Sequence, residues 1–334
     1  MSTSQLFMLP DTLRSWPWKR KLNPNHEKVK AESDAWLESF HAFPPKAQDA
    51  FDRCDFSLLA SLAYPNASAE HLRTDCDAMN LFFLFDEYTD VCDAREARQL
   101  ADIVMDALRN PDVPRPQNES VVGEITKQFW QRAKKTSIEH AQKVFIEACD
   151  SYTTSVVEQA ENREKHRTSD IETFLAIRRN DAGVRPFFAL LHLYSELPEG
   201  FLSNPLVELV LSLAVDMVAI GNDICSYNVE QARGDNFNMV NIVMNNMGLN
   251  LDEALLWISD FHDERVESFQ ETYAVIHKTL PISERTEAAV SFLEGLGNWV
   301  RANDCWSFES ERYFGQKGAE IQSSRIVELL PRST

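Results

Sequence analysis

Residues 222–230 read NDICSYNVE, and they follow directly on a long apolar segment, residues 206–221. The apolar segment predicts a helix buried in a helical core, and the polar stretch continues that helix. Asn222, Ser226 and Glu230 recur every four residues, so a helix places their side chains on one face. An amide oxygen, a hydroxyl and a carboxylate are ligands that a hard cation such as Mg²⁺ takes. Taken alone, the stretch is equally typical of a solvated helix end with a chance spacing.

A second acidic cluster follows another apolar run. Residues 81–85 read LFFLF and lead directly into Asp86, Glu87 and Asp90. Asp86 and Asp90 are four residues apart and share one face of a helix. Like charges at this spacing cost roughly a few tenths of a kcal/mol, a cost that a bound cation reverses. One such cluster is common where a helix leaves a core. Two of them predict an apolar pocket with metal ligands facing each other across its mouth.

The composition predicts a single all-α domain spanning residues 1–334. Hydrophobic residues make up 44% of the chain, only 10 residues are glycine, and no linker or charge block divides it. A 3.6-residue periodicity predicts helices, with no alternation typical of strands and no fixed repeat. Loops are predicted at residues 110–118 and 197–203. The predicted helices span residues 47–62, 69–89, 94–108, 120–132, 137–161, 170–179, 187–193, 204–231, 251–280 and 282–303.

Charge and cysteine usage exclude several classes of function. The net charge of −19 argues against binding to nucleic acid or to anionic membranes. Glu208 and Asp216 interrupt the apolar helix, which leaves no uncharged stretch long enough to span a bilayer. The six cysteines lack the spacings of zinc sites and disulfide scaffolds, and no secretory signal is recognised. We therefore expect a soluble cytoplasmic protein with free thiols.

With two further segments, the acidic clusters resemble the motifs of class I terpene synthases, specifically the fungal sesquiterpene synthases. Residues 86–90, DEYTD, resemble the aspartate-rich motif of that family, and residues 222–230 resemble its second metal motif. Arg312 and Tyr313 resemble the pair that closes on diphosphate. Residues 178–183, RRNDAG, resemble the segment carrying the diphosphate-sensing arginine, with Arg179 favoured over Arg178. Residues 9–11 and 16–18 are similar to basidiomycete members.

The chain departs from the pattern of the family at two positions. Glu87 stands second in the aspartate-rich motif, where aspartate is usual. Val229 stands where some relatives carry a basic residue directly before the last ligand of the second motif. Arg233 lies one helical turn beyond Glu230 and could supply that charge to a bound diphosphate.

The resemblance implies the class I terpenoid synthase fold, a helical bundle around an apolar active-site cavity. It implies a lyase that ionises farnesyl diphosphate with about three Mg²⁺ ions and cyclises the carbocation to a sesquiterpene, releasing diphosphate. Similarity to protoilludene-type synthases favours closure through a humulyl cation, and the enzyme is expected to be a monomer or a homodimer. The implied metal ligands are Asp86, Asp90, Asn222, Ser226 and Glu230, and the implied diphosphate-binding residues are Arg179, Arg233, Arg312 and Tyr313.

A carbocation reacts with water, so the pocket must exclude solvent and present aromatic faces to the substrate. Phe82 and Phe83 lie one turn before Asp86, and Trp306 lies six residues before Arg312, where the family often places an aromatic residue. Gly183 ends the arginine segment. We expect these four residues to line the pocket, although core packing explains any single aromatic residue equally well.

Three other classes of protein share some of these features. A chain-elongating prenyltransferase has the same helical cavity, but that family carries two aspartate-rich motifs. A catalytically inactive helical interaction protein would tolerate loss of any ligand, whereas every ligand position here holds a competent residue. A structural helical scaffold would show a repeat.

Overall fold

The computed structural model describes residues 5–164 and 170–332, nearly all of which lie in helices and the turns between them. The helices, in chain order, are α1 (His26–Glu38), α2 (Pro45–Arg53), α3 (Phe56–Ala63), α4 (Ala69–Thr89), α5 (Ala94–Arg109), α6 (Val121–Ala133), α7 (Glu139–Glu164), α8 (Ile171–Asp181), α9 (Val184–Leu190), α10 (Pro205–Arg233), α11 (Met239–Met247), α12 (Leu251–Thr279), α13 (Glu287–Glu309) and α14 (Gly318–Ser324). Short 3₁₀ turns lie at Ile282–Glu284 and Gly315–Lys317.

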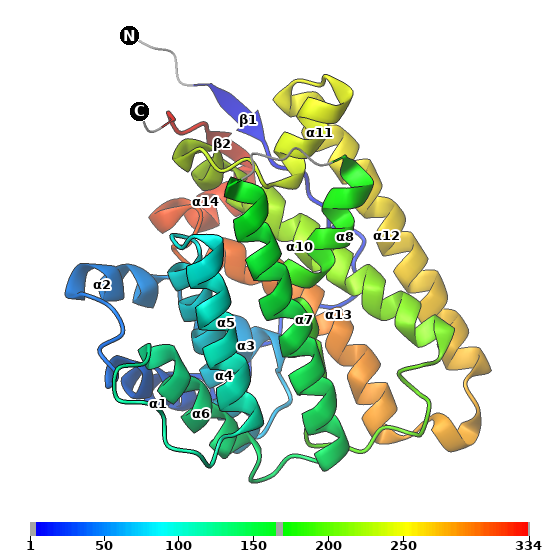
Figure 1. Ribbon diagram of the computed structural model, residues 1–334. Helices are drawn as coiled ribbons and strands as arrows, with labels where there is room; N and C mark the ends of the chain where they lie inside the picture. Colours follow the sequence, from blue (N-terminus) through cyan, green and yellow to red (C-terminus); the bar gives the residue numbers. More distant parts are fainter. Residues whose placement is uncertain (1–4, 165–169, 333–334) are drawn as a thin grey trace.

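The long helices pack side by side, with α12 and α13 against α10 and with α7 against α5 (Figure 1). α10 contacts α12 and α13 along its length and α8 near the site, while α4 packs against α1, α3 and α6. Local residues set the ends of both ligand-bearing helices. Ser68 caps α4 by accepting from the His71 amide, and Pro205 opens α10 where no amide donor is needed. Gly234 follows the last residue of α10 and caps it, with a φ of 87° that suits glycine.

By length and composition alone, α10 could cross a membrane. Half of its most apolar window is nevertheless buried inside the protein, and its neighbours α12 and α13 cover it. A central core helix has the same composition as a spanning helix, because both avoid water on most of their surface. α10 is therefore the buried helix that the apolar segment predicts.

Several predicted boundaries are wrong. Residues 47–62 form two helices, because Asp55 adopts a left-handed φ of 46° and its side chain caps α3 at the Leu58 amide. Helices α1, α11 and α14 are missed by the periodicity, and residues 282–286 are a 3₁₀ turn and a cap before α13. A small sheet is also present, although no strand was expected: β1 (Leu6–Met8) pairs antiparallel with β2 (Ile326–Glu328).

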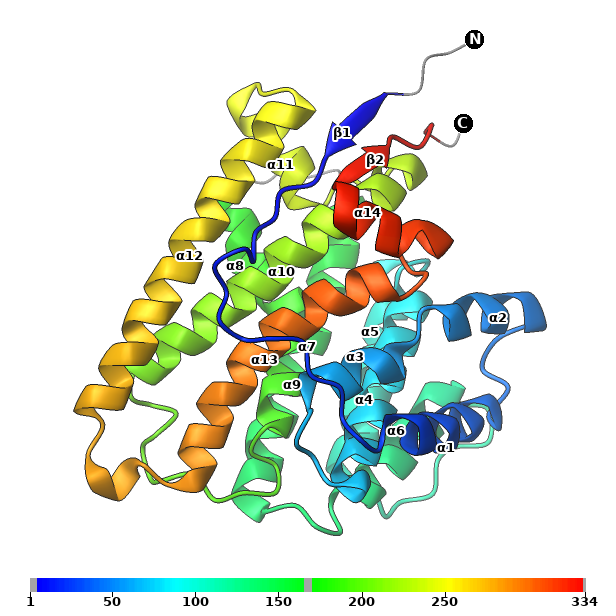
Figure 2. The same ribbon diagram turned by 180° about the vertical axis from the view of Figure 1, so that it is seen from behind.

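The N-terminal segment runs from β1 across the back of α10 and α13 toward α1 (Figure 2). Trp16 is buried, and its indole nitrogen donates to the carbonyl of Gly297 at 3.0 Å. Trp18 lies beside Trp16, with 4.7 Å between ring centroids, and donates to Glu294 at 2.8 Å. A Cβ at Gly297 would lie 2.1 Å from the Trp18 ring. Glycine at this position of α13 is therefore what lets the N-terminal segment lie flat on the bundle.

We predict that Gly297→Ala lowers the free energy of unfolding by about 1–3 kcal/mol, because two hydrogen-bonded indoles cannot move aside. Gly295→Ala is the matched control in the same helix. Its new Cβ meets only the flexible end of Leu191, 2.6 Å away, and alanine favours the helix. Urea unfolding of both variants measures the difference. Equal stability of the two variants would contradict the close packing at Gly297.

Candidate active site

The first acidic cluster lies at the C-terminal end of α4. Asp86 is partly buried in the last turn, and Asp90 is the exposed residue that ends the helix. Within the described part of the chain, no hydrogen bond or ion pair reaches either carboxylate. Burial, together with the nearby charge of Asp90, raises the pKa of Asp86 to about 7, while Arg312 opposes this. The cluster therefore holds negative charge that the surrounding protein leaves largely uncompensated.

The second cluster occupies one face of α10 over its last turns. Asn222 and Glu230 are partly exposed, and Ser226 between them is buried. Burial and the nearby Asp223 raise the pKa of Glu230 to about 7, while a hydrogen bond from Asn238 lowers it. The predicted spacing therefore puts all three oxygen-bearing side chains on one helix face, as expected.

The segment after α13 joins the two clusters. Arg312 forms an ion pair with Glu87 on α4, with 2.7 Å between Nη1 and Oε1. The adjacent Tyr313 reaches α10, where its hydroxyl accepts from the Asn222 amide at 2.7 Å. Two consecutive residues therefore contact the acidic ends of both helices, which places a cation and a hydroxyl between them. Glu87 takes part in this link, a role that the motif alone does not reveal.

Of the two adjacent arginines in α8, Arg178 is the one beside the α10 cluster. Its guanidinium donates to Asp223 at 2.7 Å and to the Asn222 side-chain oxygen at 2.9 Å. It also donates to Asp181 at 3.2 Å. Burial lowers the pKa of Arg178, but the carboxylates of Asp223 and Asp181 raise it more, so the guanidinium stays charged. Arg178 is therefore a fixed positive charge at the site.

The structure does not bring Arg179 to the predicted site. Its guanidinium makes a two-point ion pair with Asp216, at 2.6 and 2.8 Å, nearly two turns before Asn222 on α10. Arg265 of α12 approaches the same carboxylate at 3.7 Å. The motif favours Arg179 but covers both adjacent arginines. Only the position of Asp216 in the folded chain shows that Arg179 points away from the α10 cluster. Arg179 thus serves the packing of α8 on α10.

Arg233 is the last residue of α10 and is exposed. Helix geometry places it on the ligand-bearing face, one turn beyond Glu230. Its exposed position puts Arg233 at the solvent-facing end of that helix face.

Aromatic rings gather one turn below Asp86, and the predicted pocket residues are among them. Phe82 stacks on Tyr152, the ring that also covers Gly183, where an added Cβ would lie 3.2 Å away. Phe83 points the other way and stacks on Phe56 at 3.8 Å between centroids. Trp306 contacts Phe83 and Tyr313, both at 5.7 Å. The structure therefore extends an aromatic wall from α4 to the Tyr313 segment.

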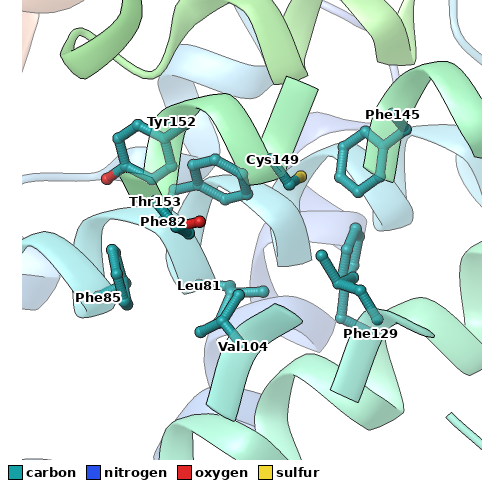
Figure 3. Close-up of a pocket in the computed structure, with 10 residues that line it drawn as sticks. Leu81, Phe82, Phe85, Val104, Phe129, Phe145, Cys149, Tyr152 and Thr153 are labelled. Atoms are coloured by element: carbon teal, nitrogen blue, oxygen red, sulfur yellow. The ribbon is translucent and has the colours of Figure 1, made fainter. Parts of the chain in front are cut away.

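An enclosed apolar cavity lies behind this wall, between α4, α5, α6 and α7 (Figure 3). Phe82, Phe85 and Tyr152 separate it from the acidic groups. Its volume of about 10 Å³ is no more than a single water molecule needs. None of the carboxylates described above lines it. It is a packing defect of the core, not the space for a substrate.

Two residues that sequence reasoning missed hold the α10 cluster in place. Asn238, fully buried, donates to the Glu230 carboxylate at 2.9 Å and to the Ser226 hydroxyl at 3.3 Å. Its own side-chain oxygen accepts from the Val240 amide, which fixes which way the amide points. Asp223 accepts from Arg178 and from the Met239 amide. Their position within and just after the motif is the only sequence feature that marks them.

The donor set fits a hard divalent cation. Among residues 5–164 and 170–332, no three His, Cys, Asp or Glu side chains converge into a compact metal site. The oxygens are instead split between α4 and α10, as suits ions shared with a multidentate anion. One oxygen lone pair of Asn222 receives Arg178 and one stays free for a cation. The uncompensated carboxylates of Asp86 and Glu230 supply the charge that such ions would neutralise.

A family model described as terpene synthase family 2, C-terminal metal binding, matches residues 77–268. The chain belongs to the terpene synthase family. The matched region contains the acidic clusters of α4 and α10 and the arginine pair of α8. Binding of divalent metal ions follows from membership, and the predictions of an all-α class I fold and of a terpene synthase are confirmed. The roles given to single residues stay predictions.

Relatives in three basidiomycetes cover nearly the whole chain. A delta(6)-protoilludene synthase of Stereum hirsutum is 49% identical and covers 97% of this chain and 88% of its own. The delta(6)-protoilludene synthase of Armillaria gallica is 47% identical, with 98% and 95% covered. Sesquiterpene synthase 14 of Postia placenta is 44% identical, with 98% and 93% covered.

Solved structures share the fold at low identity. A variant of cucumene synthase superposes with a TM-score of 0.79 at 22% identity, covering 89% of this chain and all of that one (100%). Germacradien-4-ol synthase from Streptomyces citricolor gives a TM-score of 0.75 at 21% identity, with 87% and 96% covered.

We predict that Asp86→Asn lowers turnover by at least about 100-fold. The same substitution should stabilise the metal-free protein at pH 8 by about 1–2 kcal/mol. The folded protein raises this pKa from 3.8 to about 7, so it binds the proton more tightly than the unfolded chain does. The free energy of unfolding of the wild type therefore falls as the pH rises across that range. Asparagine does not ionise, so the variant does not lose this stability.

Thermal unfolding in EDTA at pH 5 and pH 8 measures the effect, which should be visible at pH 8 and small at pH 5. Asp112→Asn, at an exposed carboxylate between α5 and α6, is the control and should change neither stability nor turnover. A less stable Asp86→Asn protein at pH 8 would show that this carboxylate supports the fold.

Proposed function

We propose that this terpene synthase is a sesquiterpene synthase that ionises farnesyl diphosphate with Mg²⁺ and cyclises the resulting carbocation. The observation that carries the proposal is the link made by Arg312 and Tyr313 between the acidic ends of α4 and α10, above a wall of aromatic rings. Charged groups thus gather on one side of the aromatic wall, as a substrate with a diphosphate head and a hydrocarbon tail requires. The protoilludene synthases named above support a product of this class.

Five oxygen-bearing side chains would hold the Mg²⁺ ions: Asp86, Asp90, Asn222, Ser226 and Glu230. When bound, Mg²⁺ stabilises the negative charge that develops on the departing diphosphate. Choice of Mg²⁺ among divalent ions is supported by the all-oxygen donor set, which contains neither imidazole nor thiolate.

Arg178, Arg312 and Tyr313 are the residues that we assign to the diphosphate, and Arg233 reaches it from the rim. Arginine presents several donors to phosphate oxygens in a fixed plane. Arg178 replaces Arg179 in this assignment because Arg178 contacts the proposed ligand Asn222, whereas Arg179 pairs with Asp216, nearly two turns earlier on α10. Arg312 would exchange its contact with Glu87 for the diphosphate.

The prenyl chain would lie against Phe83, Trp306 and their neighbours Phe56 and Tyr313. Aromatic faces stabilise a desolvated cation by roughly 0.5–2 kcal/mol per ring. The same rings exclude water from the cation. Closure through a humulyl cation is the first cyclisation that the similarity to protoilludene synthases favours.

We further propose that residues 1–334 form one catalytic domain, since the N-terminal segment and β2 both pack on the bundle. A cytoplasmic location is supported by the six cysteines, all of which are unpaired. A monomer and a homodimer are both compatible with an enzyme whose proposed ligands all come from one chain.

We predict that purified protein converts farnesyl diphosphate to a cyclic sesquiterpene, with diphosphate released, only when Mg²⁺ is present. EDTA should abolish product formation, and added Mg²⁺ should restore it, because the acidic clusters cannot bind diphosphate unaided. Mass spectrometry of the volatile products measures the outcome. Release of a longer prenyl diphosphate in the presence of isopentenyl diphosphate would instead support a prenyltransferase.

We predict that Arg178→Lys weakens binding of inorganic diphosphate with Mg²⁺ by about tenfold or more, because lysine cannot reproduce the multi-point contact. Arg179→Lys, its neighbour in the same helix, should leave diphosphate affinity within about twofold. Isothermal titration calorimetry compares the two variants. A larger loss in Arg179→Lys than in Arg178→Lys would restore Arg179 as the sensing residue.

A further inference from the structure

The two ends of the chain meet on the side of α10 opposite its ligand-bearing face. β1 and β2 form a two-stranded sheet, here called the terminal sheet, in which Phe7 pairs with Val327. Both side chains are buried, at 4% and 2% exposure, and the Phe7 ring meets Tyr227 of α10 edge-on at 6.1 Å between centroids. Because 3.6 residues make one turn, Asn228 lies on the opposite side of α10 from Ser226 and Glu230.

Side chains of α10 bind the main chain at the end of β2 and just after it. Asn228 makes a two-point contact: its amide donates to the Glu328 carbonyl at 2.9 Å, and its oxygen accepts from the Leu330 amide at 2.9 Å. One turn later, Gln231 donates to the Leu330 carbonyl at 2.8 Å. Asn228 and Gln231 are 6% and 4% exposed, so these bonds are shielded from water.

These contacts fall where a helix is weakest. α10 ends at Arg233, so Glu230 lies in its last turn, where the Gln231 and Glu230 carbonyls accept from the amides of Gly234 and Asp235, just beyond the helix. Helix ends open more readily than helix centres. The terminal sheet is itself tied down on both strands, since Leu9 donates to the Arg325 carbonyl at 2.8 Å and Leu329 to the Gln5 carbonyl at 2.8 Å. A fixed sheet bound to residues 228 and 231 keeps that last turn helical.

We propose that Asn228 is a positioning residue, through which the terminal sheet holds Ser226 and Glu230 in the geometry that binds Mg²⁺. The inference rests on the proposed metal site of α10. The apparent affinity for a ligand falls in proportion to the fraction of molecules in the competent state. If the last turn of α10 were intact in one molecule of ten, the Mg²⁺ requirement would rise about tenfold.

The test uses Asn228→Ala in the full chain and two measurements. One is the Mg²⁺ concentration for half-maximal turnover of farnesyl diphosphate. The other, independent of activity, is the Mg²⁺ concentration for a half-maximal rise in unfolding temperature at a fixed concentration of inorganic diphosphate. Both midpoints should rise about tenfold, while turnover at saturating Mg²⁺ stays within about threefold of wild type.

Asn23→Ala is the matched control. Asn23 is 1% exposed and also holds main-chain carbonyls, those of Tyr64 and Ala67 at 2.8 and 2.9 Å, but it lies away from α10. It should lose comparable stability and keep the wild-type Mg²⁺ midpoints. A purely structural role for Asn228 would move neither midpoint or would move them equally in both variants, and either result would overturn the proposal.

Leu330→Pro tests the same contact from its other side. Proline lacks the backbone N–H that donates to the Asn228 side-chain oxygen, and the sequence of α10 stays unchanged. This variant should raise both Mg²⁺ midpoints by at least about threefold, and it decides the matter if Asn228→Ala does not fold. Wild-type midpoints in Leu330→Pro would refute the role of the terminal sheet. Absence of any Mg²⁺ response in the wild type would instead refute the proposed metal site, and this inference with it.

Discussion

Negative charge held at the ends of two buried helices is the constraint on which this structure depends. Asp86 and Glu230 both have raised pKa values because burial and like-charged neighbours disfavour their ionised forms. The packed aromatic core carries no positive charge. The charge that balances these carboxylates must therefore come from residues outside α4 and α10. Arg178 and Arg312 supply part of it, each bound to a carboxylate that is not itself a proposed ligand. Within the described residues, the carboxylates of Asp86 and Glu230 are thereby left without an ion pair, at a cost in stability that a bound cation would remove.

The network around Arg178 shows how that arrangement is kept rigid. Asp223 takes the guanidinium on one oxygen and the Met239 amide on the other. Asn238 then connects the start of α11 to Ser226 and Glu230. If Arg178 moved toward an anion, Asp223 would move with it, and the contact of Asp223 with the Met239 amide would shift the start of α11. α8, α10 and α11 meet at this point, and each contributes a polar group that the others satisfy.

Periodicity and spacing were sufficient to predict the all-α fold and the shared face of Asn222, Ser226 and Glu230. They could not separate Arg178 from Arg179, because neighbours in a helix point about 100° apart and only the placement of Asp223 and Asp216 decides which one faces the site. The break at Asp55 depends on a left-handed residue within an otherwise helical pattern. The terminal sheet escaped prediction because three-residue strands carry too little alternation, and their pairing joins residues about 320 positions apart.

The meeting of the first and last strands makes the chain nearly a closed ring. Leu329 donates to Gln5, so a short linker between these two residues would leave the bundle undisturbed, and new ends could be opened in the exposed loop between α5 and α6. In such a permuted protein, α10 and the terminal sheet would become interior segments of one continuous polypeptide. The order in which the helices are synthesised would change, while the neighbours of each helix would not.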